Sequence, residues 1–158
     1  MKSQQPAPAK TPYAGDLLAL DKQLCFALYS ASLAMTKTYK PLLEKLGLTY
    51  PQYLVMMVLW ERDGLLVKEI GERLFLDSGT LTPLLKRLQA SALIARTRDQ
   101  ADERQVRITL TAAGRALKKK AQEIPLQVLC ASGQPLAALQ NLRTQLVQVR
   151  DDLVRGQA

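Results

Sequence analysis

The chain has 158 residues, a net charge of +8 at pH 7 and no histidine, and 47% of its residues are hydrophobic while 5% are aromatic. This length suggests one domain with a sizeable core, the Leu- and Ala-rich composition favours a mainly helical protein, and the basic charge suits a polyanionic partner. The absence of histidine excludes histidine-dependent catalysis and histidine-ligated metal sites, and two cysteines cannot form a cysteine-rich metal site by themselves.

The first residues, 1–13, are rich in Pro, Gln, Ala and Lys, which predicts a disordered tail. They contain no hydrophobic stretch of the signal-peptide kind, and no apolar run in the chain reaches the length of a membrane span. We therefore expect a cytoplasmic protein whose thiols stay reduced and which does not contact a membrane.

Two helices are predicted next. Asp16 is expected to cap a long helix from Leu17 to about Tyr39 or Lys40, with Pro41 breaking or kinking it and Gly47 ending its continuation. The segment Thr49–Tyr50–Pro51–Gln52 then has the pattern of a capping box, with a proline near the start of the following helix. That helix should run to about Arg62 and is nearly all apolar, so it should form the centre of the core.

Two short helical patterns follow, separated by a tight linker. The first covers Lys68–Leu74, the linker is Phe75–Leu76–Asp77, and the second covers about Thr80–Ala90, with its start left open between Ser78 and Thr80. Pro83 is tolerated if this helix starts late. Its leucines form one apolar face, and its other face and flanks carry the candidate DNA-binding residues, which are Ser78, Thr80, Thr82, Pro83, Lys86 and Arg87. An ordinary amphipathic surface helix would show the same pattern.

The next segment favours DNA binding. Leu93–Arg98 and Gln105–Leu110 alternate at the period of strands, and Asp99–Arg104 forms a polar turn between them. Four arginines cluster at this hairpin, where an arginine at the tip can reach into a narrow minor groove; they are Arg96, Arg98, Arg104 and Arg107. The predicted fold is mainly α with a small β-wing, a winged helix-turn-helix with its core at 49–111.

The C-terminal part is helical again. Thr111 can cap a helix from Ala112 to Glu123 whose basic face is expected to be solvated, and Pro125 bends the chain before Cys130. After a turn at 132–135, the last helix has a coiled-coil-like seam formed by Leu139, Leu142, Leu146, Val149 and Leu153. We expect 14–158 to form a single unit that dimerises through helices in 16–47 and 112–155, so that two helix-turn-helix motifs read a palindrome.

The order of these elements resembles the MarR family of dimeric repressors. The resemblance rests on Asp102–Glu103–Arg104 in the wing and on Leu110–Thr111 closing the second strand, while Ala92 stands where a glycine often ends the DNA-binding helix. It implies that Asp102 helps to hold the wing and that Arg104 enters the minor groove of a double-stranded DNA operator.

Three segments, LDKQLCFALYSA, LTYPQYLVM and LDSGTLTPLLKRL, are similar to the branch of this family that senses organic hydroperoxides, the OhrR-like repressors. That similarity implies that Cys25 is the sensing residue, that Tyr39 and Tyr50 hydrogen-bond it and that Tyr29 lies near the same pocket. It also implies the two-cysteine form, in which oxidised Cys25 forms a disulfide with Cys130 of the other subunit.

The spacing of these residues constrains the site. Cys25 and Tyr29 are four residues apart and share a helix face, whereas Cys25 and Tyr39 are roughly 21 Å apart along a straight helix. Tyr39 can therefore bond Cys25 only across a dimer whose first helices cross. Phenol donors favour the thiolate that attacks a peroxide, and the resulting sulfenic acid is trapped by a second thiol.

We therefore predict a homodimeric, redox-sensing transcriptional repressor that needs no cofactor or metal, is not an enzyme, and releases its operator when an organic hydroperoxide oxidises it. The resemblance implies that the target gene encodes a peroxide-reducing enzyme. Three alternatives remain: a repressor released by a small aromatic ligand, a thiol peroxidase, and a basic architectural protein without sequence preference. Peroxide-induced DNA release by a Cys25→Ser variant would favour the ligand-released repressor. Catalytic turnover with a reductant would favour the thiol peroxidase, and a DNA footprint without a preferred position would favour the architectural protein.

Overall fold

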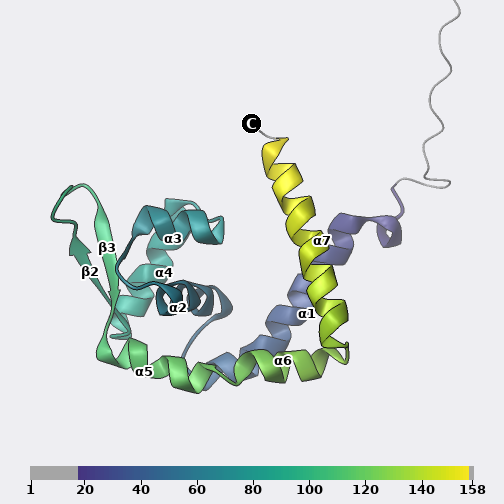
Figure 1. The fold of residues 1–158 in the computed structure, drawn as a ribbon, viewed down its shortest axis with the longest axis horizontal. Helices are drawn as coiled ribbons and strands as arrows, with labels where there is room; N and C mark the ends of the chain where they lie inside the picture. Colours follow the sequence, from purple (N-terminus) through teal and green to yellow (C-terminus); the bar gives the residue numbers. More distant parts are fainter. Residues whose placement is uncertain (1–17, 157–158) are drawn as a thin grey trace, which may run out of the picture. The chain divides into compact units, whose positions relative to one another are not determined.

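A computed structural model describes residues 18–156. The expected tail at 1–13 and the predicted helix start at Asp16 and Leu17 lie outside these residues. The chain divides into two compact units, one ending at Met35 and one beginning at Thr36. Figure 1 shows the helices and strands of the chain with their labels.

The first long helix differs from the prediction at both ends. A short 3-10 helix covers Leu20–Lys22, and α1 covers Leu24–Glu44, because the backbone of Gln23 is extended between them. The helix also continues through Pro41 and does not end near Tyr39 or Lys40. A proline removes only one backbone hydrogen bond, and the burial of Leu43, which is 1% exposed, offsets that loss. Gly47, with φ 68°, ends the continuation as predicted.

The second helix, α2 (Tyr50–Glu61), begins at the predicted capping box. The backbone N–H of Thr49 donates to Gln52 Oε1 at 2.9 Å, and the backbone N–H of Gln52 donates to Thr49 Oγ1 at 3.4 Å. The capping box thereby satisfies two of the backbone N–H groups that have no partner within the helix. The helix supplies much of the core, as its apolar sequence predicts, and its buried residues are Gln52, Tyr53, Val55, Met56, Val58 and Leu59.

The helix-turn-helix consists of α3 (Val67–Leu74) and α4 (Ser78–Ala90). The turn between them starts at Phe75, which adopts the left-handed conformation with φ 56°. The backbone of this turn packs directly against Gly71, where a Cβ would lie 2.8 Å from the carbonyl oxygen of Leu76. Helix α4 starts at Ser78, the earliest position of the range left open by the sequence, so Pro83 is its sixth residue and costs an internal hydrogen bond.

The wing is the hairpin of β2 and β3 in Figure 1, and it belongs to a three-stranded antiparallel sheet with the order β1-β3-β2. Strands β2 (Ile94–Arg98) and β3 (Val106–Leu110) form the predicted hairpin, with Ile94 opposite Leu110 and Arg98 opposite Val106. The third strand, β1 (Leu65–Leu66), pairs Leu65 with Ile108 and was not predicted. Two residues are too few to show a strand period, so only the tertiary pairing reveals this strand.

Three helices complete the chain: α5 (Ala112–Ala121), α6 (Ile124–Ser132) and α7 (Leu136–Arg155). Thr111 caps α5 by accepting a hydrogen bond from the backbone N–H of Gly114 at 3.0 Å, as predicted. The helix ends at Ala121, short of the predicted Glu123, and Pro125 does not simply bend the chain but lies in the first turn of α6. A proline in this position is favourable because its missing N–H would have no partner there.

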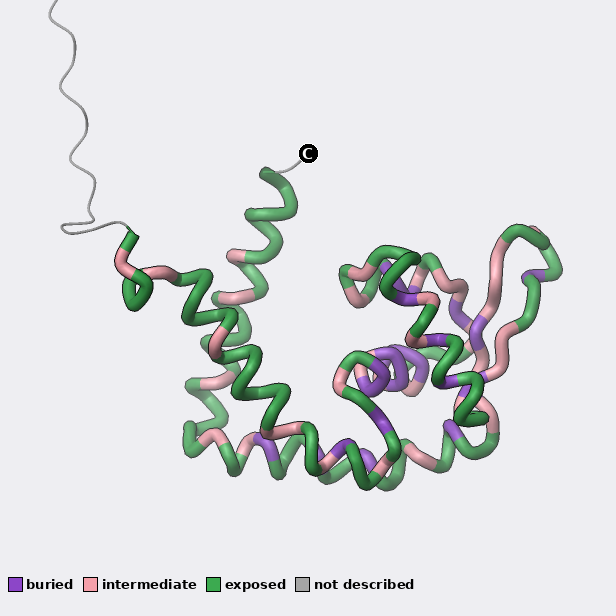
Figure 2. The backbone as a smooth tube through the Cα atoms, turned by 180° about the vertical axis from the view of Figure 1, so that it is seen from behind, coloured by how far each residue is buried: buried purple, intermediate pink, exposed green. Residues whose placement is uncertain are grey.

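Burial separates these elements clearly. Buried positions concentrate in α2, α3, α4 and the sheet, whereas α7 has no buried residue and is drawn almost entirely as exposed in Figure 2. Within residues 18–156, no helix is long and apolar enough to cross a membrane, and no group of three metal-ligating side chains occurs.

Candidate nucleic-acid interface and redox site

Helix α4 has the two faces that its sequence predicts. Leu81, Leu85 and Leu88 are at most 1% exposed and fix the helix against the core. The other face is open to solvent at Ser78, Thr80, Pro83, Lys86 and Arg87, and Thr82 is half-buried beside it. The surface that remains is small and polar in the first turns and cationic further along, which suits a helix lying in a major groove.

The start of α4 is fixed by Asp77. Its Oδ1 accepts a hydrogen bond from the backbone N–H of Thr80 at 2.7 Å, and this bond lowers the pKa of the Asp77 carboxyl. The charged cap therefore persists at neutral pH and holds the first turn, which carries Ser78 and Thr80, in helical geometry.

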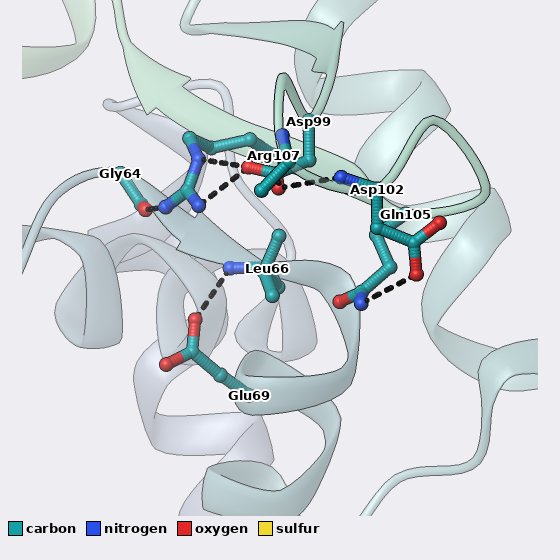
Figure 3. Close-up of polar contacts among 8 residues, drawn as sticks. Gly64, Leu66, Glu69, Asp99, Asp102, Gln105 and Arg107 are labelled. Carbon is teal, nitrogen blue, oxygen red and sulfur yellow. Dashed lines mark hydrogen bonds and ion pairs between the residues drawn. The ribbon is translucent and has the colours of Figure 1, made fainter.

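The hairpin arginines do not form one cluster. Arg107 donates from Nε and Nη2 to Asp99 Oδ1 at 2.9 and 2.6 Å, and from Nη1 to the carbonyl oxygen of Gly64 (Figure 3). Arg96 is half-buried with its Nε enclosed, whereas Arg98 and Arg104 are exposed. Of the four arginines that are close together in the hairpin sequence, Arg107 is therefore held against the sheet by a buried carboxylate.

Two carboxylates shape the turn that presents Arg104. Asp99, 8% exposed, accepts from the backbone N–H groups of Ala101 and Asp102 at 3.2 and 3.3 Å. Asp102 accepts from the backbone N–H of Arg104 at 3.0 Å. It also accepts from the Gln105 side chain at 3.0 Å (Figure 3).

Hydrogen bonds to Asp99 and Asp102 favour the charged form of both carboxyl groups. The hydrogen bond from the Arg107 side chain lowers the pKa of Asp99, and the hydrogen bond from the Gln105 side chain lowers the pKa of Asp102. The sequence analysis did not assign a role to Asp99. An aspartate at the first position of a turn often accepts hydrogen bonds from backbone N–H groups of that turn, and this position was the available signal.

A groove joins the helix-turn-helix to the wing. It encloses about 810 Å³ between the turn at Phe75–Ser78 and the hairpin, and Thr82, Arg96 and Arg104 also line it. Residues from α4 and from the wing therefore border one continuous surface, as a protein requires when it follows a DNA strand from the major to the minor groove.

The predicted sensing residues fall in different parts of the structure. In the N-terminal unit, Cys25 is an exposed free thiol on α1, and Tyr29, one turn further along, is 62% exposed. In the second unit, Cys130 is an exposed free thiol on α6.

Tyr39 and Tyr50 come together in the second unit, with ring centroids 4.9 Å apart. Tyr53 joins them at 5.9 Å from Tyr39 and 6.4 Å from Tyr50, and we call these three residues the tyrosine cluster. Burial raises the pKa of all three phenols, so they stay protonated at neutral pH and can donate hydrogen bonds. Sequence reasoning missed Tyr53, although its position three residues after Tyr50 on one helix face was a signal.

Together, the helix-turn-helix, the wing and the exposed polar face of α4 define a winged-helix DNA-binding transcriptional regulator. Comparison with known proteins gives the same class. Residues 37–121, more than half of the chain, match the family described as transcriptional regulator SarA/Rot.

The chain is 51% identical over 138 residues to the organic hydroperoxide resistance transcriptional regulator of Bacillus subtilis, covering 87% of this chain and 94% of that protein. It is 55% identical over 138 residues to the transcriptional regulator TtmR of Methylorubrum extorquens, covering 87% and 71% respectively. This chain therefore belongs to the MarR family of transcriptional regulators, in the branch that contains the organic hydroperoxide resistance regulator, and is not an enzyme.

Solved structures agree with this assignment. The reduced form of AbfR of Staphylococcus epidermidis bound to DNA superposes with a TM-score of 0.72 at 37% identity, covering 85% of this chain and 94% of that chain. A disulfide-formed AbfR superposes with a TM-score of 0.60 at 35% identity, covering 86% and 92%. Relatives of this chain thus include regulators solved both on DNA and in an oxidised state.

Proposed function

We propose that the protein is a cytoplasmic, homodimeric repressor that senses organic hydroperoxides through Cys25 and releases a pseudo-palindromic operator when Cys25 is oxidised. The named function of the Bacillus relative and the two forms of AbfR support this proposal.

The observation that carries the proposal is the pair of phenols at Tyr39 and Tyr50, whose rings lie 4.9 Å apart. Their raised pKa values keep both O–H groups available as donors. Two such donors stabilise a thiolate over a thiol, and the thiolate is the form of cysteine that attacks a peroxide. Because Cys25 and Tyr39 are roughly 21 Å apart along one straight helix, the donors serve the Cys25 of the partner subunit.

The chemistry has two steps. The Cys25 thiolate attacks one peroxide oxygen, the O–O bond breaks, and the leaving alkoxide takes a proton to give an alcohol, so that Cys25 becomes a sulfenic acid. The thiol of Cys130 of the partner subunit then attacks the sulfenic sulfur, a disulfide forms, and water leaves. Both cysteines are exposed and unpaired in this reduced chain, which leaves them open to this sequence of events.

Apolar surface that no described residue covers supports dimerisation. Phe26, Leu28 and Leu33 on α1 are 37–55% exposed, and Leu142 and Leu153 on α7 are 50% and 62% exposed. An apolar surface of this kind marks a protein interface. Two copies of α4 related by a two-fold axis would then meet two half-sites of one operator.

On DNA, we assign α4 to the major groove and the wing to the minor groove. The assigned contacts from α4 are those of its exposed face, namely Ser78, Thr80, Thr82, Pro83, Lys86 and Arg87. From the wing, Arg104 enters the minor groove and Asp102 holds the turn that presents it. The hydrogen bonds that Asp102 accepts within the turn support this division of roles.

The test is electrophoresis under non-reducing conditions after treatment with stoichiometric cumene hydroperoxide or hydrogen peroxide. We expect a band at twice the subunit mass that dithiothreitol reverses, that the organic peroxide produces more readily, and that Cys25→Ser and Cys130→Ser both abolish. The same samples, titrated onto an operator found by footprinting, should lose affinity only where Cys25 is present.

Two results would overturn the proposal. Both thiols remaining free after peroxide treatment would remove the redox mechanism and turn attention to an aromatic ligand. Peroxide-induced DNA release by the Cys25→Ser variant would show that Cys25 is not the sensor.

A further inference from the structure

Tyr53 is the innermost member of the tyrosine cluster, and the proposed function gives it no role. Its side chain is 2% exposed and contacts Tyr39 and Tyr50 on one side. On the other side it contacts Trp60, with ring centroids 6.2 Å apart in an edge-on arrangement. Tyr53 and Trp60 are two turns apart on the same face of α2, so one rigid helix carries both rings.

Trp60 is in turn tied to the start of α5. Its indole N–H donates to the carbonyl oxygen of Gly114 at 2.9 Å, and Lys118 Nζ donates to the carbonyl oxygen of Trp60 at 3.0 Å. Gly114 has no free space around it, because a Cβ there would lie 2.1 Å from the carbonyl oxygen of Leu93. Helix α5 is thus held between Trp60 and the residue that precedes strand β2.

The next residue, Arg115, continues the link into the wing. Its Nη1 lies 2.7 Å from Asp63 Oδ2, and Asp63 Oδ1 accepts from the backbone N–H of Leu110 in β3 at 2.8 Å. Further along β3, Arg107 binds both Gly64 and Asp99, the carboxylate that shapes the wing turn. Side-chain and backbone contacts therefore connect the tyrosine cluster, through Trp60, α5 and β3, to the turn that presents Arg104.

We propose that Tyr53 and Trp60 are positioning residues that couple the arrangement of Tyr39 and Tyr50 to the base of the wing. This inference rests on the proposed function, in which oxidation of Cys25 ends the hydrogen bonds donated by those two phenols. Packed interiors do not deform continuously, so a shift of the Tyr39 and Tyr50 rings displaces the enclosed ring of Tyr53. That displacement reaches Trp60 and strains its bond to Gly114, which moves α5 and the strand ends it contacts.

The experiment compares operator dissociation constants before and after stoichiometric cumene hydroperoxide, with the ratio of the two as the measure of coupling. Trp60→Phe keeps an aromatic ring but removes the N–H, and Val58→Ala is the control for lost stability, because Val58 is buried in the same helix without entering the aromatic contacts. For wild type we expect a ratio of about 5 to 150, the usual size of allosteric coupling. Trp60→Phe should lower it about fivefold with little change in reduced-state affinity, while Val58→Ala should preserve it.

A second measurement needs no folded Trp60 variant. Trp60 is the chain's single tryptophan, so its fluorescence reports on this position alone. Emission should shift when wild type is oxidised, and the shift should disappear in Tyr53→Leu even though Cys25 is oxidised to the same extent.

The possible results distinguish a failure of this inference from a failure of the proposed function. Wild type that keeps its operator after Cys25 is oxidised overturns the proposed function and this inference with it. Two other results would overturn the inference alone. In the first, oxidation releases the Trp60→Phe variant from DNA as much as it releases the wild-type protein. In the second, the oxidised wild-type protein releases DNA while its Trp60 emission stays unchanged.

Discussion

The winged core and the C-terminal helix use apolar residues at similar spacing, yet they differ in what covers those residues. In α4, Leu81, Leu85 and Leu88 are at most 1% exposed because α2, α3 and the sheet close over them. In α7, Leu142 and Leu153 are 50% and 62% exposed, and no residue of that helix is buried. Among the described residues, the winged core therefore buries its own apolar side chains, whereas α7 leaves its seam uncovered, which fits the proposed interface with a second chain.

The largest effect is expected from breaking that seam. Replacing Leu142 and Leu153 together by Glu should yield a monomer whose affinity for a two-site operator falls about 100-fold or more, because two linked half-sites no longer bind together. Sedimentation equilibrium and operator titration measure this. Gln140→Glu, which adds the same carboxylate to the same helix away from the seam, should leave the dimer intact. A double variant that remains dimeric would show that α7 is not the interface.

Gly114→Ala tests the opposite region. The new Cβ would lie 2.1 Å from a backbone oxygen that cannot move aside, so the free energy of unfolding should fall by about 3 kcal/mol. Gly156→Ala is the matched control, since its Cβ would meet its nearest atom at 3.5 Å. Urea denaturation of both variants measures the difference. A loss below about 1 kcal/mol for Gly114→Ala would mean that the contact between α5 and the wing base is soft.

Arg104 and Arg107 separate DNA contact from stability within the wing. Arg104→Gln should weaken operator binding about tenfold and reduce the salt dependence by about one counterion, with no change in unfolding. Arg107→Gln should instead lower stability, because it leaves Asp99 without its cationic partner. The reverse assignment, with Arg107→Gln abolishing binding in a protein of unchanged stability, would refute this division.

The smallest effect is a pH dependence carried by Asp99. Its pKa is lowered in the folded chain, so its contribution to stability is present above the unfolded value of about 3.9 and is lost as the pH falls through the folded value. The stability difference between wild type and Asp99→Asn should therefore shrink when urea denaturation is repeated at progressively lower pH below about 4. A difference that persists or grows on acidification would exclude the ion pair with Arg107 as its source.

Local sequence signals predicted most of the regular structure. Thr49 and Thr111 could be recognised from the sequence as helix caps. A cap accepts a hydrogen bond from a backbone N–H three residues later, so it depends on neighbouring residues only. The alternation from Val106 to Leu110 likewise specifies a strand with one buried face. The leucine spacing in α4 and the hairpin that follows it favoured a DNA-binding module, and the resemblance to the MarR family identified it.

Tertiary structure decided the features that depend on distant partners. Pro41 lies inside α1 and Pro83 inside α4, because burial of neighbouring leucines outweighs one lost hydrogen bond. The two residues of β1 become a strand only by pairing with β3. Arg107 binds back onto the sheet because Asp99, eight residues earlier in the chain, folds next to it.

The sequence by itself therefore determined the class of the protein, since helix caps, apolar periods and the similarity of three segments are properties of neighbouring residues. Only the tertiary structure decided which polar groups serve the fold and which remain for function. Asp99 and Arg107 are eight residues apart, and Trp60 and Gly114 are 54 residues apart; these partners meet only when the core excludes water and brings them close.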